Sequence, residues 1–219
     1  MKPAGVILSD LIKGNTDYAS STPNSSFENL QECQSPHVTL VSCSDSRVSS
    51  RVFGLDPTNY IFHVRNIGNQ IATSQGSVDY SVLHLRTPVL MVMGHTGCGA
   101  VKAALSDYSD ETAGIRKELD SLKAGLRKTF DDEDAVVREA KYAELNVDEQ
   151  VKAAMEKYSD LISSGKLMAA GAMMDFHDVY SDERGAVFIT NINGETGKAG
   201  IASLESVPDA ARESINRIQ

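Results

Sequence analysis

The chain has 219 residues, of which 41% are hydrophobic, and this is enough apolar material for one α/β domain with a proper core. Its formal net charge of -9 argues against a nucleic-acid partner or an anionic membrane surface, because both normally require a basic face. No segment approaches the ~20 consecutive apolar residues that a membrane span requires. We therefore expect a single domain over residues 1–219 that binds neither nucleic acid nor a membrane.

The cysteine content points to a reducing compartment. Three cysteines are too few and too uneven for a disulfide framework. The N-terminus does not resemble a signal peptide, since its apolar run at residues 6–8 is short and is followed by Ser9 and Asp10. Cytoplasm is the simplest location.

The predicted elements begin with a helical arm at residues 4–18, whose apolar stripe (Val6, Ile7, Leu11) would dock on another surface. Residues 20–26 are typical of a linker. Apolar runs then predict strands at residues 38–42, 60–64, 89–93 and 167–174, and a helix starts near Ser77.

The second half is expected to be mostly helical and then to close the sheet. Residues 107–158 are charged and helical in pattern, and Asn146 is interpreted as the N-cap of the helix that leads into the fourth strand. Residues 186–192 are predicted to pair back as an antiparallel edge strand, before a terminal helix at 209–218. The fold class is thus α/β, with a mostly parallel central sheet, an antiparallel edge strand, flanking helices and an N-terminal helical arm.

Reactive side chains follow two of the predicted strands. Cys43 ends the first, and His95 and Cys98 follow the third with His-x-x-Cys spacing. The carboxyl ends of neighbouring parallel strands share one crevice, so we expect these three side chains to meet. Two thiolates and an imidazole suit zinc, and three protein ligands leave a position for water or substrate, as in a catalytic site. The competing interpretations are two buried cysteines beside a glycine-rich turn, or a redox dithiol, in which His95 would have no purpose.

The sequence Cys-Ser-Asp-Ser-Arg at residues 43–47, followed about fifty positions later by His-x-x-Cys-Gly at 95–99, resembles the zinc site of the β-class carbonic anhydrases. The resemblance continues through residues 64–69, 76–80 and 146–147, and covers most of 34–174. It implies reversible hydration of CO2 to bicarbonate and a proton by zinc-bound hydroxide, which is the activity of a carbonate dehydratase, a zinc lyase. Two thiolate ligands should lower the pKa of the bound water less than three imidazoles would, so we expect an alkaline-shifted activity.

The resemblance also assigns roles to the residues beside the ligands. Asp45 and Arg47 form a dyad: when Arg47 holds Asp45 off the metal, the carboxylate accepts a hydrogen bond from the zinc-bound hydroxide. When Asp45 swings in, it becomes a fourth ligand and closes the site. The sequence does not choose between the open and closed resting states.

Substrate contacts and partners follow in the same way. The resemblance makes Gln34 an amide donor to bicarbonate and makes Phe62 and Tyr80 an aromatic wall, and Gly99 beside Cys98 is a further predicted substrate contact. It implies a homodimer or tetramer with the active site at the subunit interface, and residues 1–30 as an arm that packs on the partner subunit.

Some features stay open or depart from the family pattern. Hydrolysis of carbonyl sulfide or carbon disulfide on the same zinc site, and a non-catalytic zinc- or bicarbonate-binding relative, are the alternatives. His63 is a candidate proton shuttle, with a strand histidine of no kinetic role as the competing interpretation. The chain has no tryptophan, which makes the inhibitory bicarbonate site of some bacterial members doubtful. Residues 175–180 also differ from common members and receive no role.

Overall fold

The computed structural model describes residues 2–28 and 30–218. The chain divides into two compact units, Met1–Ser35 and Pro36–Gln219. In the first, α1 (Ala4–Ser21) confirms the predicted N-terminal helix and is followed by α2 (Ser25–Glu28). The apolar side chains of α1 are exposed, so their docking on a partner stays a prediction. No helix in the described part of the chain combines the length and the apolar character needed to cross a bilayer.

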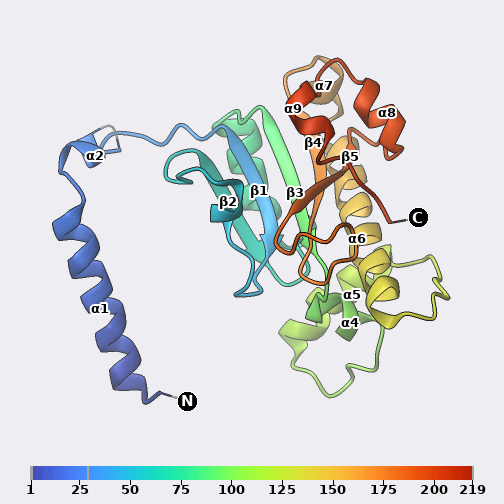
Figure 1. The fold of residues 1–219 in the computed structure, drawn as a ribbon, viewed down its shortest axis with the longest axis horizontal. Coiled ribbons are helices and arrows are strands. Elements are labelled where there is room, and N and C mark those ends of the chain that lie inside the picture. Colours follow the sequence, from blue (N-terminus) through green and yellow to red (C-terminus); the bar gives the residue numbers. More distant parts are fainter. Residues whose placement is uncertain (1, 29, 219) are drawn as a thin grey trace. The chain divides into compact units, whose positions relative to one another are not determined.

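The second unit is built on a single sheet (Figure 1). Among the described residues its strands follow the order β2-β1-β3-β4-β5. Their bounds are β1 (Val38–Cys43), β2 (Ile61–Asn66), β3 (Val89–His95), β4 (Met168–Met174) and β5 (Val187–Ile192). The first four run parallel, and β5 is antiparallel to β4 at the edge, so the expected fold class is confirmed. The parallel register brings the carboxyl ends of β1 and β3 to the same edge of the sheet.

Helices and turns connect these strands. The helices of this unit are α3 (Gln75–Asp79), α4 (Gly99–Ala104), α5 (Ala113–Gly125), α6 (Ala135–Lys157), α7 (Ser159–Ser163), α8 (Lys198–Ser203) and α9 (Asp209–Arg212). Short 3-10 turns lie at Ser50–Phe53 and Ala72–Ser74, and a π-helical turn at Tyr80–His84 continues α3. The predicted helix near Ser77 is therefore two short pieces.

The long helix α6 packs on β3 and β4 where each strand carries a glycine. A Cβ atom at Gly94 of β3 would lie 2.8 Å from Val147 Cγ2, and one at Gly171 of β4 would lie 2.8 Å from Val147 Cγ1. Glycine at both positions lets the helix approach the sheet. Val147 is fully buried there and belongs to the main core.

Asn146 does not cap a helix, contrary to the expectation from sequence. It lies buried in the middle of α6, where its Nδ2 donates to Gly68 O at 2.8 Å. The N-cap is Asp134, which accepts hydrogen bonds from the backbone N–H groups of Val136 and Val137. A tertiary contact explains the asparagine, and local capping preference gave the wrong position for the helix start.

The charged segment and the C-terminus also differ from the expectation. Residues 107–158 are not continuously helical, because a loop separates α5 from α6. The terminal helix α9 ends at Arg212, since Ile215 is buried beside Ile189 of β5. The backbone of residues 214–216 exchanges hydrogen bonds with Ile189, which a continuing helix would not allow.

Candidate metal centre and active site

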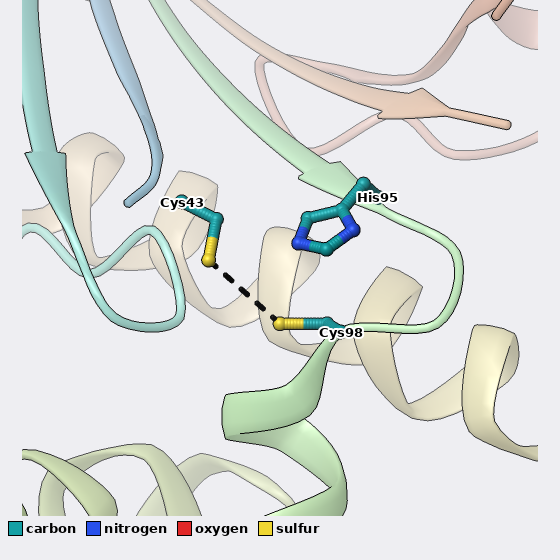
Figure 2. A group of neighbouring side chains, drawn as sticks. All are labelled: Cys43, His95 and Cys98. Atoms are coloured by element: carbon teal, nitrogen blue, oxygen red, sulfur yellow. Dashed lines mark hydrogen bonds between the residues drawn. The ribbon is translucent and has the colours of Figure 1, made fainter. Parts of the chain in front are cut away.

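Three potential metal ligands meet at the carboxyl edge of the sheet (Figure 2). Cys43 ends β1, His95 ends β3, and Cys98 precedes the first residue of α4. Their ligand atoms lie within 4.8 Å of one another, and the two sulfurs are 4.0 Å apart. All three side chains are buried. The structure thus brings together the residues that the sequence predicted as metal ligands.

Hydrogen bonding fixes the orientation of the His95 imidazole. Its Nδ1 lies 3.0 Å from the carbonyl oxygen of Thr96, which can only accept, so Nδ1 carries the hydrogen. The lone pair is then on Nε2, a buried atom with no hydrogen-bond partner among the described residues. A metal ligand requires this tautomer, and an ion at Nε2 would satisfy the atom.

The two thiols influence each other's ionisation. The Cys98 thiol donates to the Cys43 sulfur, which lowers the pKa of Cys43 despite burial. The same interaction, together with burial, raises the pKa of Cys98. Because metal binding requires deprotonated sulfur, a divalent cation between the two atoms would favour both thiolates. The donor set therefore fits a soft, four-coordinate ion such as zinc.

The turn between His95 and Cys98 requires a glycine. Gly97 has φ +65°, and a Cβ atom there would lie 2.5 Å from Cε1 of His177. Only glycine adopts this backbone without strain and without a clash. The turn in this way brings both ligands to one side within four residues.

Asp45 lies beside the cluster and is held by Arg47. Nε and Nη2 of Arg47 donate to Oδ1 and Oδ2 of Asp45 at 3.0 and 2.7 Å, and the Arg47 backbone N–H donates to Oδ1 at 3.0 Å. The side-chain hydrogen bonds from Arg47 are the main reason that the pKa of Asp45 lies well below its usual range. Oδ2 is 3.9 Å from Nε2 of His95. The carboxylate is thus ionised and adjacent to the predicted metal ligands.

Sequence reasoning assigned no structural role to Arg65, yet it supports the loop that carries Cys43 and Asp45. Its guanidinium donates to the carbonyl oxygens of Cys43 at 3.2 Å, Asp45 at 2.7 Å and Val48 at 3.1 Å. These bonds use two of its nitrogens and fix the loop after β1. Its position in the family-like run at residues 64–69 was the available signal.

A buried polar network anchors the segment after β4, which sequence reasoning left without a role. Thr96 Oγ1 donates to Asp175 Oδ1 at 3.2 Å and accepts from the Phe176 N–H at 2.8 Å. Asp175 also accepts from the N–H groups of His177 and Tyr180. Since the single hydroxyl hydrogen of Thr96 goes to a carboxylate, Nδ1 of His177, 3.0 Å from Oγ1, must itself carry a hydrogen.

The predicted substrate contacts lie on separate segments of the chain. Phe62 and Tyr80 lie near each other, with ring centroids 6.1 Å apart, but Phe62 pairs with Thr39 near the start of β1. Gly99 is exposed at the first position of α4. Gln34 is an exposed residue of the first unit. Their roles toward substrate stay predictions.

Comparison with known proteins identifies the family and the fold. The family model described as carbonic anhydrase matches residues 38–181, which include the whole cluster. Carbonic anhydrase 2 of Mycobacterium tuberculosis is 27% identical over 185 residues, covering 77% of this chain and 86% of that protein. A tetrameric β-carbonic anhydrase from Sordaria macrospora has a TM-score of 0.67 and 25% identity, covering 78% of this chain and 92% of that one. The Coccomyxa β-carbonic anhydrase solved with acetazolamide shares the fold, with a TM-score of 0.68, 24% identity and coverage of 91% and 93%. The chain therefore belongs to the β-class carbonic anhydrase family.

Proposed function

We propose that this protein catalyses the reversible hydration of CO2 to bicarbonate and a proton, with a zinc ion held by Cys43, His95 and Cys98. The observation that carries the proposal is the buried cluster itself, in which Nε2 of His95 presents a free lone pair beside two sulfurs 4.0 Å apart. When bound there, zinc would lower the pKa of a water molecule. The pKa would stay above the ~7 of a three-histidine site, because two thiolates neutralise the charge of the ion.

Asp45 is the residue best placed to orient the attacking oxygen. Its Oδ1 already accepts two hydrogen bonds from Arg47, whereas Oδ2 accepts one and faces His95 at 3.9 Å. Each carboxylate oxygen has two acceptor positions, so Oδ2 keeps one for a hydrogen bond from the attacking water. Because the pKa of Asp45 lies well below its usual range, the group is ionised and remains an acceptor near neutral pH. We therefore assign catalysis to Asp45 and its positioning to Arg47.

The arrangement also supports an open fourth position. Arg47 holds both carboxylate oxygens of Asp45, and its Nη2 additionally donates to Gly97 O at 3.1 Å. With these bonds made, Asp45 lies outside the group of three residues whose ligand atoms are within 4.8 Å of one another. Three protein ligands with one remaining position suit a catalytic rather than a structural ion.

We further propose that the working unit is a homodimer or a tetramer with the active site at a subunit interface. Phe62 pairs with Thr39, four residues before Cys43 on β1, which at about 3.3 Å per residue is ~13 Å along the sheet. An aromatic wall of Phe62 and Tyr80 thus suits a second copy's cluster better than its own, and Tyr80 is 45% exposed. The exposed apolar stripe of α1 and Gln34 are the other surfaces that a second copy would cover. The Sordaria macrospora relative is tetrameric.

A cytoplasmic location fits the thiolates, which need a reducing compartment.

The alternatives are less well supported. Carbonyl sulfide or carbon disulfide hydrolysis would use the same ligands, but the family match is to carbonic anhydrases. A non-catalytic zinc- or bicarbonate-binding protein would not need the Asp45–Arg47 fork beside the cluster.

The test combines metal analysis with stopped-flow CO2 hydration between pH 6.5 and 9. We expect about one zinc per chain and a rate that rises with pH in the wild type. Cys98→Ser should lose both zinc and activity with its fold retained, and Cys33→Ser, which changes an exposed free cysteine, should keep both. Zinc-filled, folded protein that shows no CO2 hydration at any pH would overturn the proposal, and carbonyl sulfide would be the next substrate to try.

A further inference from the structure

Phe176 occupies a place in the site that neither the ligand motif nor the dyad explains. It is half-buried and comes two residues after the end of β4. Its backbone is fixed by the Thr96 hydroxyl, and Thr96 itself is fully buried and donates its N–H to Met174 O at 3.0 Å. The turn that carries His95 and Cys98 therefore also sets the position of the Phe176 ring.

The ring contacts two groups of the site at once. The guanidinium carbon of Arg47 lies 5.1 Å from the centre of the Phe176 ring, within the range of a cation–π contact. The imidazole of His95 packs edge-to-face on the same ring, with centroids 5.7 Å apart and planes at 68°. Phe176 thus lies against both the residue that holds Asp45 and a predicted metal ligand.

Arg47 needs such a contact because its side chain is 48% exposed. A long, half-exposed arginine loses considerable rotamer freedom when it is held in one geometry. The fork to Asp45 and the bond to Gly97 O fix its end, and the ring supplies a flat surface against its guanidinium. The ring favours the one rotamer in which all of these contacts are made together.

We propose that Phe176 is a positioning residue that holds the Arg47 guanidinium in the orientation that keeps Asp45 off the metal ligands. The consequence for turnover rests on the proposed function, whereas the positioning of Arg47 does not. Without the ring, Arg47 samples other rotamers, and Asp45 spends part of its time unpaired beside His95. Turnover falls because the acceptor is misplaced, while substrate affinity, which does not use Asp45, stays the same.

The chain offers variants that separate the ring from simple packing. Phe176→Leu and Phe176→Met keep an apolar side chain but remove the aromatic face, and Phe176→Tyr keeps the face. Phe130→Leu is a matched control, since Phe130 is also half-buried and has the Lys128 ammonium over its ring, 5.8 Å from the centroid. It takes no part in the site.

Two readouts are measured on the full chain. The first is the rate at which phenylglyoxal modifies Arg47, followed by peptide mass spectrometry, which requires neither metal nor activity. The second is kcat and KM for CO2 hydration of the zinc-loaded protein. For Phe176→Leu we expect the rate of Arg47 modification to rise about two- to fivefold and kcat to fall by the same factor. This is the range for loss of a partly exposed cation–π contact. KM should not change, and Phe176→Tyr and Phe130→Leu should match the wild type.

The results decide the proposal in either direction. Unchanged reactivity of Arg47 in Phe176→Leu, or an equal increase in Phe176→Tyr, would overturn it. If the leucine variant does not fold, Phe176→Met answers the same question. If the wild type itself hydrates no CO2, the proposed function fails, and the labelling of Arg47 still decides whether the ring positions it.

Discussion

Arg47 binds Asp45 through both carboxylate oxygens, with Nε 3.0 Å from Oδ1 and Nη2 2.7 Å from Oδ2. The same Nη2 donates to Gly97 O, so the arginine also connects the loop after β1 to the turn between His95 and Cys98. One planar guanidinium makes both connections, which a point charge on a flexible stem does not reproduce.

Arg47→Lys should therefore impair catalysis without loss of the metal. A lysine ammonium would keep the charge but hold one carboxylate oxygen, leaving Asp45 free to rotate. We expect kcat for CO2 hydration to fall about 10- to 100-fold, the usual range for loss of a group that orients a catalytic site, with the zinc content unchanged. Arg184→Lys is the control, because Arg184 forms a similar fork to Asp178. Equal losses in the two variants would show that the effect is not specific to the site.

The buried carboxylate of Asp175 should be important for stability. It is fully buried and accepts hydrogen bonds from the Thr96 hydroxyl and from the backbone N–H groups of His177 and Tyr180. Asp175→Asn turns one acceptor oxygen into a donor that faces these donors, which should cost about 1–3 kcal/mol of unfolding free energy. Urea unfolding measures this, with the exposed Asp182→Asn as a control expected to change little. A wild-type midpoint in Asp175→Asn would argue against a structural role for the network.

Packing of α6 on the sheet gives a pair of opposite predictions for the same substitution. A methyl group at Gly171 would lie 2.8 Å from Val147 and 2.9 Å from Asn191, so Gly171→Ala should destabilise the protein by about 1–3 kcal/mol. Gly114 in α5 has nothing within 4 Å of its Cβ position, and Gly114→Ala should stabilise by up to about 1 kcal/mol through helix propensity. Thermal or urea unfolding checks both signs. If both variants moved in the same direction, close approach at Val147 would not be what requires glycine at 171.

The sequence predicted the ligand cluster because its signals are local and short. One predicted strand is followed directly by a cysteine, and a second is followed by His-x-x-Cys. If the two strands are parallel neighbours, their carboxyl ends place these ligands at one edge of the sheet. The antiparallel edge strand was also predicted from its local apolar pattern. The predicted helix start at Asn146 was wrong, because this side chain donates a hydrogen bond to Gly68, which is distant in the sequence.

Long-range contacts also explain the structural roles that the sequence did not predict. Phe176 contacts Arg47, and Arg65 donates a hydrogen bond to the Cys43 carbonyl oxygen. Both pairs are far apart in the sequence, so no periodic pattern indicates them. The predicted terminal helix was too long, because Ile215 pairs with Ile189 of β5 and Arg217 forms ion pairs with Glu144 and Asp148 of α6. Such pairings depend on the finished fold, so residue spacing alone does not reveal them.

His63 gives a pH dependence of stability whose sign can be worked out. Its Nε2 lies 2.7 Å from Ser42 Oγ, and burial, assisted by the positive charge of Arg65, lowers its pKa from 6.5 to about 4. Between these values the unfolded chain binds a proton that the folded chain does not, so the unfolding free energy decreases as the pH falls from 6.5 toward 4. Above pH 6.5 the contribution is fully present. A histidine that stays neutral through this range is also a poor proton shuttle near neutral pH.

The measurement is urea unfolding of the wild type and of His63→Gln from pH 7.5 to 4. Glutamine has no titrating group, so the difference in unfolding free energy between the two proteins isolates His63 from carboxylates that titrate in both. The wild type should lose about 1–2 kcal/mol relative to the variant over this range, less than the full pKa shift implies because the half-buried ring keeps part of its solvent screening. A difference that does not change with pH would mean that His63 titrates alike in the folded and unfolded chains. Burial would then not keep His63 neutral, and its role as a proton shuttle would be open again.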